Sequence, residues 1–322
     1  MLYLYIQEII TIKAPMQFYI LTSSLLEGVH RATKVIPSKD MVVVINTTDK
    51  EYVERAVDYC NENELEYYVT ESDGTPATGK NSVLKLFLES DNDYMVHVDG
   101  DDIITHHGYR LYTRMAKHES PPDMVVLYRQ PQIRDIIDFD YVLNEVQNLN
   151  EQKALNLNIK YPYDKSDPTF GTIDHEYLIY YFKKYFLIKD KTANRWATDR
   201  VEFANMMNKY SESKEFMTRM VFISRNIAQE MYYDPVLSVG EDTIQFLKLK
   251  RLAVEGKYNI IRRKEKNVPT YISNYNENSI TNIVGRKGND WDWIRPLVDE
   301  ILKLGNLPED INLPELDDAT YL

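Results

Sequence analysis

The sequence is poor in cysteine and has no long apolar run. Cys60 is the only cysteine, which excludes internal disulfides and any metal cluster built from cysteines. No apolar run approaches the roughly 18 residues that a membrane span needs, so we expect no membrane interaction. The first fifteen residues lack the basic start and the small-residue cleavage site of a secretory signal. These features together favour a cytoplasmic location.

Positive charge is also scarce. The chain holds 38 lysines and arginines against 50 aspartates and glutamates, for a net charge of −12. This balance argues against indiscriminate nucleic-acid binding by the whole surface, although it leaves room for one local basic face. With 43% apolar and 27% charged residues over 322 positions, the composition predicts a globular chain of one large or two ordinary domains.

Apolar runs and helical patterns alternate through the first 130 residues. Strands are predicted at 17–25, 41–45, 65–70, 93–99 and 123–130, and helices at 51–64, 81–88 and 105–119. This βαβ alternation predicts an α/β fold with a mostly parallel sheet and helices on both faces. Ligands of such sheets bind at the carboxyl ends of the strands.

Three carboxylates follow the fourth predicted strand within the segment DYMVHVDGDDII. Asp99, Asp101 and Asp102 surround Gly100. If the strand continued, Asp99 and Asp101 would point to the same face, roughly 6–7 Å apart. Carboxylates this close raise one another's pKa, and a divalent cation such as Mg²⁺ would relieve the repulsion. The alternative is an acidic turn, because Asp and Gly are common turn residues.

The loop GTPATGKN, residues 74–81, nearly matches the phosphate-binding pattern G-x-x-x-x-G-K-[ST]. On this interpretation Gly74–Lys80 would bind nucleotide phosphates, as in a kinase. However, Asn81 stands where a metal-binding hydroxyl is required, and Pro76 removes an N–H donor from the loop. We therefore keep a phosphate-loop nucleotide kinase as the alternative.

The ordered motifs resemble those of GT-A fold nucleotide-sugar glycosyltransferases, especially the large inverting family 2. The turn Asn46–Asp49 is similar to that family's D-x-S-x-D turn, and Lys80-Asn81 to its Arg-Asn pair. The segment VHVDGDD resembles its metal motif. The resemblance implies that a UDP-sugar donor contacts the residues Thr22, Asn46, Asp49, Lys80, Asn81 and Asp99. It also implies that Mn²⁺ or Mg²⁺ is bound by Asp101 with Asp99 and Asp102.

Gly240-Glu241-Asp242 resembles the same family's E-D motif, whose aspartate is the catalytic base. It lies about 140 residues after the acidic segment. An inverting transfer needs one carboxylate to accept the acceptor's proton, and the resemblance implies that Asp242 does so beside Glu241. The competing explanation is that both acids stabilise the first turn of a helix.

A basic stretch follows the Glu241-Asp242 pair. It contains Lys248, Lys250, Arg251, Lys257, Arg262, Arg263, Lys264 and Lys266. A solvated helix face with its loop is one explanation, and a surface that follows the phosphates of duplex DNA is the other. The composition of the chain, which is rich in Tyr, Asn, Lys and Asp, is also similar to that of tailed-phage proteins. That likeness suggests a hydroxymethylcytosine glycosyltransferase or arabinosyltransferase acting on phage DNA inside the infected host cell.

The resemblance divides the chain into three parts. Residues 1–130 would be the nucleotide-sugar-binding half of a GT-A-like domain, 131–219 a helical insertion in the acceptor region, and 220–322 the base, the basic stretch and a C-terminal cap. We therefore expect a metal-dependent glycosyltransferase using UDP-arabinose or UDP-glucose, with 5-hydroxymethylcytosine as acceptor. A polysaccharide or protein glycosyltransferase of the same fold is the second alternative.

Overall fold

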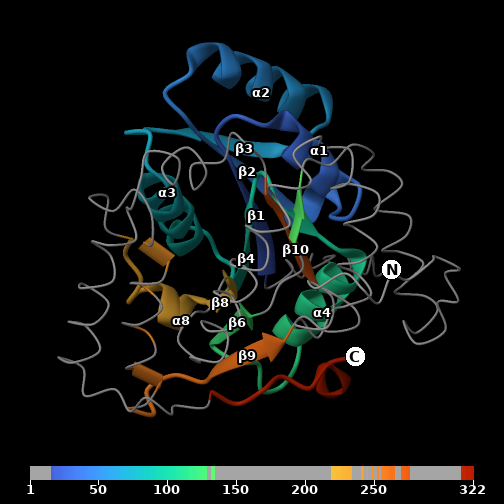
Figure 1. The fold of residues 1–322 in the computed structure, drawn as a ribbon, viewed down its shortest axis with the longest axis vertical. Helices are drawn as coiled ribbons and strands as arrows, with labels where there is room; N and C mark the ends of the chain where they lie inside the picture. Colours follow the sequence, from blue (N-terminus) through green and yellow to red (C-terminus); the bar gives the residue numbers. More distant parts are fainter. Residues whose placement is uncertain are drawn as a thin grey trace, which may run out of the picture.

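A seven-stranded sheet forms the centre of the protein (Figure 1). The computed structural model describes residues 16–128, 132–134, 219–233, 241–242, 245, 249, 252–253, 255–264, 270–275 and 313–322. The strand order is β3-β2-β1-β4-β8-β6-β9. The strands are β1 (Met16–Thr22), β2 (Met41–Asn46), β3 (Glu66–Thr70), β4 (Tyr94–Asp99), β6 (Met124–Tyr128), β8 (Arg219–Ser224) and β9 (Ile260–Lys264).

Most neighbouring strands of this sheet run parallel. β1 pairs in parallel with β2 and β4, β2 with β3, and β6 with β9. β8 is the exception, since it runs antiparallel to both β4 and β6. The predicted α/β class with a mostly parallel sheet is therefore confirmed. The sheet also joins strands from residues 16–128 to strands from residues 219–264.

Helices cover both faces of the sheet. They are α1 (Leu26–Thr33), α2 (Lys50–Glu62), α3 (Pro76–Glu89), α4 (His106–Ala116) and α8 (Arg225–Ala228). Because side chains alternate along a strand, Phe18 and Ile20 face a core completed by α1, α2 and α4. Tyr19 faces the opposite core, which α3 and α8 complete. Two apolar layers thus enclose the strands and hold their ends in register.

A second sheet of three strands has the order β5-β10-β7. The strands are β5 (Ile103–Ile104), β7 (Gln132–Arg134) and β10 (Tyr271–Tyr275). β10 pairs antiparallel with β5, directly after the acidic segment, and parallel with β7. The short helices η1 (Ser38–Asp40) and η4 (Asp318–Thr320) complete the described elements. β10 therefore brings Tyr271 next to the end of β4.

Some of the predicted boundaries were wrong. The helix expected to begin at Asn81 begins at Pro76, because the Thr75 hydroxyl accepts the Thr78 N–H as an N-cap and proline is favoured at the start of a helix. Two further elements, α1 and β9, were not predicted from the sequence. The predicted helical insertion falls almost entirely outside the described residues, as does most of the predicted cap. Among the described helices, none has the length and apolar character to cross a bilayer.

Candidate active site

The carboxyl ends of four parallel strands form one edge of the sheet. These ends are Thr22 of β1, Asn46 of β2, Thr70 of β3 and Asp99 of β4. Because β8 runs antiparallel to β4, it brings its first residue, Arg219, to the same edge. The edge therefore collects polar and charged side chains from the start, the middle and the later part of the chain.

The acidic segment turns away from the sheet at this edge. β4 ends at Asp99, and the Asp102 N–H donates to the Asp99 carbonyl over 3.0 Å, which closes a turn. The Gly100 N–H donates to the Leu21 carbonyl over 2.6 Å. A Cβ at position 100 would lie 2.5 Å from that carbonyl oxygen, so only glycine fits. The expectation that Asp99 and Asp101 point to the same face of a continuing strand was wrong, because the strand ends at Asp99 and the chain turns, as in the alternative interpretation.

The turn brings three carboxylates together. One oxygen each from Asp99, Asp101 and Asp102 lies within 4.8 Å of the others. A cluster of carboxylate oxygens is the donor set that Mg²⁺ and Mn²⁺ prefer. The buried His97 imidazole supports this interpretation, because its Nε2 lies 3.3 Å from Asp99 Oδ1 and has no hydrogen-bond partner. The residues therefore fit a divalent cation, with a polar nitrogen directed at one ligand.

Arg219 bridges two of the three carboxylates. Its Nη1 donates to Asp99 Oδ2, and its Nη2 donates to Asp102 Oδ2 over 2.7 Å. The guanidinium lies 5.8 Å from the centre of the Tyr271 ring, and the Tyr271 hydroxyl accepts the Asp99 N–H over 3.1 Å. Arg219 Nη1 also lies 3.9 Å from Asp242 Oδ2. One arginine thus connects the acidic turn to the second acidic motif.

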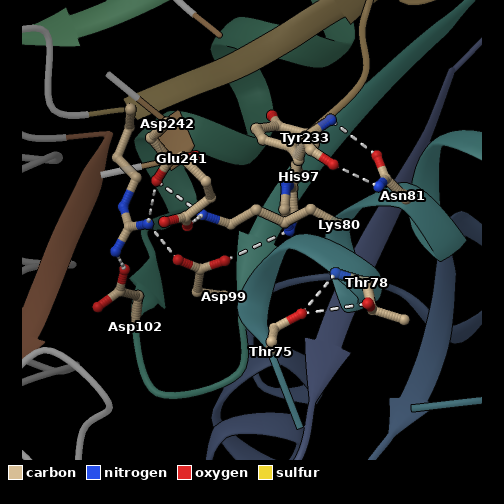
Figure 2. A network of polar contacts seen from close by, with 11 residues as sticks. Thr75, Thr78, Lys80, Asn81, His97, Asp99, Asp102, Tyr233, Glu241 and Asp242 are labelled. Atoms are coloured by element: carbon tan, nitrogen blue, oxygen red, sulfur yellow. Dashed lines mark hydrogen bonds and ion pairs between the residues drawn. The ribbon is translucent and has the colours of Figure 1, made fainter. Parts of the chain in front are cut away.

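Lys80 holds that second motif. Its Nζ lies 2.6 Å from Glu241 Oε1 and 2.7 Å from Asp242 Oδ2 (Figure 2). It also lies 5.5 Å from the centre of the Tyr233 ring. The next residue, Asn81, exchanges two hydrogen bonds with the Tyr233 backbone, of 2.7 and 2.9 Å. Helix α3 therefore positions the Glu241-Asp242 pair beside the acidic turn, although about 140 residues separate the two motifs.

The charges of the site do not balance. We call Asp99, Asp101, Asp102, Glu241, Asp242, Lys80, Arg219 and Arg31 the site cluster. Arg31 of α1 belongs to it because its charge acts on Asp101 and Asp102. Among these described residues, five carboxylates face three side-chain cations, which leaves an excess of two negative charges. One divalent cation would neutralise that excess.

Burial and neighbouring charge shift the pKa values of the site in different directions. Burial, together with the charge of Asp99, raises the pKa of Asp101. Burial likewise raises the pKa of Glu241, although Lys80 opposes the shift. For Asp99, burial is outweighed by Arg219 and Lys80, so its pKa lies below the usual range. Lys80 is buried, yet Asp242 and Glu241 hold its pKa well above the usual value. Lys80 therefore stays charged at neutral pH.

The residues expected to contact the nucleotide already have protein partners. The Thr22 hydroxyl is buried against the hydroxyl of Tyr52. The Asn46 amide donates to Thr70 Oγ1 and to the Glu71 carbonyl, over 2.8 and 2.7 Å. Asp49 caps α2 by accepting two backbone N–H groups. They lie at or next to the sheet edge that holds Asp99, and their roles in nucleotide binding stay predictions.

The phosphate-loop alternative does not fit the geometry. Residues from Pro76 onward form the first turns of α3, so Gly79 and Lys80 lie inside a helix instead of ending a loop. A phosphate-binding loop needs its backbone N–H groups to face the ligand before the helix begins. In addition, the Lys80 side chain points to Glu241 and Asp242, not to its own loop (Figure 2).

Within the basic stretch, the structure describes the side chains of Lys257, Arg262 and Arg263. Residues 260–264 form β9 and pair with β6, contrary to the expected helix face. Arg263 is buried, and its Nε and Nη2 donate to Asp318 over 2.8 and 2.5 Å, while His107 Nε2 lies 3.1 Å from Asp318 Oδ2. We call these three residues the β9 cluster. Lys257 forms an ion pair with Glu230.

The buried pairing with Asp318 corrects the interpretation of Arg263 as a phosphate-binding side chain. The Lys257 side chain is 48% exposed, so its predicted role in DNA binding stays a prediction. The described part of the chain does not include the side chains of Lys248, Lys250, Arg251, Lys264 and Lys266. The prediction that they bind DNA therefore stays untested.

Arg219, His97 and Tyr271 were not assigned to the site from the sequence. Arg219 opens a strand that the apolar run at 220–226 does indicate, but only the antiparallel pairing of β8 brings it to Asp99. His97 lies two residues before Asp99, and the alternation of strand side chains places both on the same side of β4. That alternation was the one available signal for His97.

No protein-family model and no curated protein sequence matches the chain. Among solved structures, S. aureus TarS 1–349 in complex with UDP-GlcNAc matches 91% of this chain and 68% of its own, at 13% identity and a TM-score of 0.49. The match to another S. aureus TarS structure covers 40% of that chain, with a TM-score of 0.45. A mannosyltransferase from Pyrobaculum calidifontis, in complex with GDP-Man and Mn²⁺, is 15% identical over 41% of this chain, with a TM-score of 0.28. At these levels of similarity, no family or activity follows for this chain.

Proposed function

We propose that this protein is a metal-dependent glycosyltransferase that moves a sugar from a UDP-sugar to an acceptor hydroxyl. The observation that carries the proposal is the meeting of two acidic motifs. Asp99, Asp101 and Asp102 share one sheet edge with Glu241 and Asp242. A site that only stabilised the fold would not need five carboxylates, because unpaired buried charge is costly.

The acidic turn has the composition of a metal–diphosphate site. Asp101, with Asp99 and Asp102, would hold Mn²⁺ or Mg²⁺, which when bound supplies the positive charge that stabilises a departing diphosphate. Asp99 is the carboxylate that also reaches Arg219 and His97, so it would be fixed in place when the sugar nucleotide binds. Lys80 would support the diphosphate from the other side.

Asp242 is the proposed general base. Its side chain is more exposed than that of Glu241, at 27% against 7%, so an acceptor hydroxyl can reach it. The bond from Lys80 Nζ to Asp242 Oδ2 orients the carboxylate and leaves its second oxygen to accept a proton. Glu241, with its raised pKa and its buried carboxylate, would position Lys80.

The predicted residue contacts to the nucleotide complete the proposal. Thr22, Asn46, Asp49 and Asn81 lie at or near the carboxyl ends of β1 and β2 and in α3, where open α/β sheets bind ligands. Rotation of the Asn46 amide from Thr70 would free it for a nucleotide. The proposed division of the chain at 130 and 219 places all four in its first part.

For the acceptor, we keep 5-hydroxymethylcytosine in duplex DNA as the hypothesis, with a polysaccharide or protein acceptor as the alternative. The DNA hypothesis rests on the basic stretch at 248–266, from which Arg263 is now removed by its buried ion pair with Asp318. DNA binding would weaken steeply with added salt, whereas a polysaccharide acceptor would be insensitive to it. A protein that does not bind DNA even at low salt would refute the DNA hypothesis and leave the transferase proposal intact.

The decisive experiment measures UDP release from a panel of UDP-sugars with Mn²⁺, with and without hydroxymethylcytosine-containing duplex DNA. UDP-arabinose and UDP-glucose are included. We expect release by the wild-type protein and its loss in Asp101→Ala, whereas the exposed-residue control Glu230→Gln should retain it. If no UDP is released from any UDP-sugar and ATP is hydrolysed in a reaction that needs Lys80, the transferase proposal fails in favour of the kinase alternative.

A further inference from the structure

Arg219 binds the same carboxylates that form the proposed metal site. Its two terminal nitrogens reach Asp99 Oδ2 and Asp102 Oδ2, and both oxygens belong to residues of the three-carboxylate group. A guanidinium and a divalent cation repel each other and compete for the same lone pairs. The arrangement in the structure is therefore one in which Arg219 and a metal would exclude each other from Asp99 and Asp102.

The backbone of the turn that carries these carboxylates is held in place by groups other than Arg219. The Asp99 backbone N–H donates to the Tyr271 hydroxyl, and His97 Nε2 lies 3.3 Å from Asp99 Oδ1. The Asp102 N–H is bonded to the Asp99 carbonyl. His97 is buried, and its Nε2 has no hydrogen-bond partner, so a nitrogen is already directed at Asp99. The turn can thus keep its shape when the guanidinium leaves.

A displaced guanidinium needs another anion nearby. The Arg219 side chain is 22% exposed, so it can rotate toward solvent at the edge of the sheet. The planar fork of an arginine fits a phosphate as well as it fits a carboxylate. A diphosphate that arrives with the cation would supply that anion at the same place.

We propose that Arg219 is a phosphate-binding residue of the donor site, which exchanges Asp99 and Asp102 for the donor diphosphate when a divalent cation takes those carboxylates. This inference rests on the proposed function, because it assumes a nucleotide-diphosphate donor. It assigns a role to a residue outside the recognised motifs. It also predicts that removal of Arg219 strengthens the binding of the divalent cation and weakens the binding of the diphosphate.

The experiment measures binding of Mn²⁺ alone, and of UDP in the presence of saturating Mn²⁺, by titration calorimetry. In Arg219→Gln the two carboxylates lose their competitor, so Mn²⁺ alone should bind about tenfold more tightly. UDP should bind about tenfold more weakly, because a charged contact to its phosphates is gone. Uridine, which has no phosphate, should bind equally to both proteins.

Two further variants make the test specific. Arg110→Gln removes a positive charge from the exposed face of α4 and should change neither affinity. Arg219→Lys keeps the charge but loses the fork, so both affinities should shift in the same directions as in Arg219→Gln, by less. Arg219→Lys also serves as the test if Arg219→Gln does not fold.

Weaker Mn²⁺ binding in the Arg219 variants would overturn the inference, since it would mean that the arginine organises the metal site. Unchanged affinities, or a wild-type protein that binds Mn²⁺ but not UDP, would also overturn it. The outcome is separate from the test of function. Sugar transfer without the opposed shifts would refute the inference alone, whereas opposed shifts without sugar transfer would refute the transferase and retain the phosphate role of Arg219.

Discussion

Two buried ion-pair clusters among the described residues differ in composition. In the β9 cluster, one carboxylate, Asp318, is bound by Arg263 and lies against His107. In the site cluster, five carboxylates face Lys80, Arg219 and Arg31. Both clusters join segments that are far apart in the sequence. Only the site cluster carries an excess of negative charge.

This difference separates a structural ion pair from a functional site. Burial of an unpaired charge is costly, so an ion pair that only fastens two segments contains no more acids than its cations can bind. The β9 cluster fits that description, since its arginine and histidine fasten β9 and α4 to the segment at 313–322. The site cluster does not fit that description, because it contains more carboxylates than cations. Its surplus carboxylates lower stability unless a cation or a substrate uses them.

The largest expected effect is on turnover. Asp242→Asn removes the proposed base while keeping the size of the side chain, and turnover should fall by about 10²–10⁴-fold. Asp318→Asn is the same substitution in the β9 cluster and should leave turnover per folded molecule unchanged. UDP release in steady state measures both. If both variants lost turnover equally, the site cluster would not differ in function from the β9 cluster.

The next effect tests the cost of the unbalanced charge. Lys80→Met removes the cation that binds both Glu241 and Asp242, and should lower the free energy of unfolding by about 3–5 kcal/mol. The triple variant Lys80→Met, Glu241→Gln, Asp242→Asn removes the stranded charges as well and should recover much of that loss. Urea unfolding measures both proteins. If the triple variant were no more stable than the single one, the loss would come from packing.

The third effect concerns the backbone beneath the acidic turn. Gly100→Ala places a Cβ against the Leu21 carbonyl oxygen, 2.5 Å away, and should cost up to about 3 kcal/mol of unfolding free energy. The turn must shift to relieve the contact, so Mn²⁺ binding should weaken too. Gly74→Ala makes a contrasting variant, because a Cβ there meets no atom within 4 Å and only its positive φ of 84° opposes the change. Full Mn²⁺ affinity in Gly100→Ala would show that the turn tolerates movement.

The sequence predicted the first half of the sheet better than the second. β1, β2 and β4 are apolar runs, and each packs against helices on both faces, so the pattern alone reveals them. β9 has the sequence IIRRK, whose basic residues predict a charged surface instead of a buried strand. Its Arg263 is buried because Asp318, 55 residues later, neutralises it. No local pattern contains that information.

The same limit applies to the candidate site. Asp99, Asp101 and Asp102 were found as one short motif, and Lys80 and Asp242 by their order along the chain. Arg219 was not found, since it precedes an apolar run in a segment without a motif and lies 120 residues from Asp99. Its position follows from the antiparallel direction of β8, which the βαβ pattern of the earlier strands does not predict. The acidic residues of the site can thus be recognised from sequence motifs, whereas the position of Arg219 depends on the strand topology.

The smallest expected effect is on stability in the β9 cluster. Burial alone would raise the pKa of Asp318, but the bonds with Arg263 and His107 outweigh it and hold the pKa below the usual range. A lowered pKa in the folded state means that the ionised carboxylate stabilises the protein at neutral pH. This contribution is fully present above the unfolded-state pKa and is lost as pH falls through the folded-state value.

Asp318→Asn should therefore lower the free energy of unfolding by about 1.5 kcal/mol at pH 7, and the gap to wild type should close only at pH values below about 4. Asp317→Asn, next to it in the chain, serves as a control, because Asp317 accepts only the Ala319 N–H that it caps. Urea unfolding between pH 3 and 7 measures the gap. If Asp318→Asn instead lowered turnover without changing stability, the β9 cluster would belong to the functional site, and an excess of negative charge would no longer distinguish the two clusters.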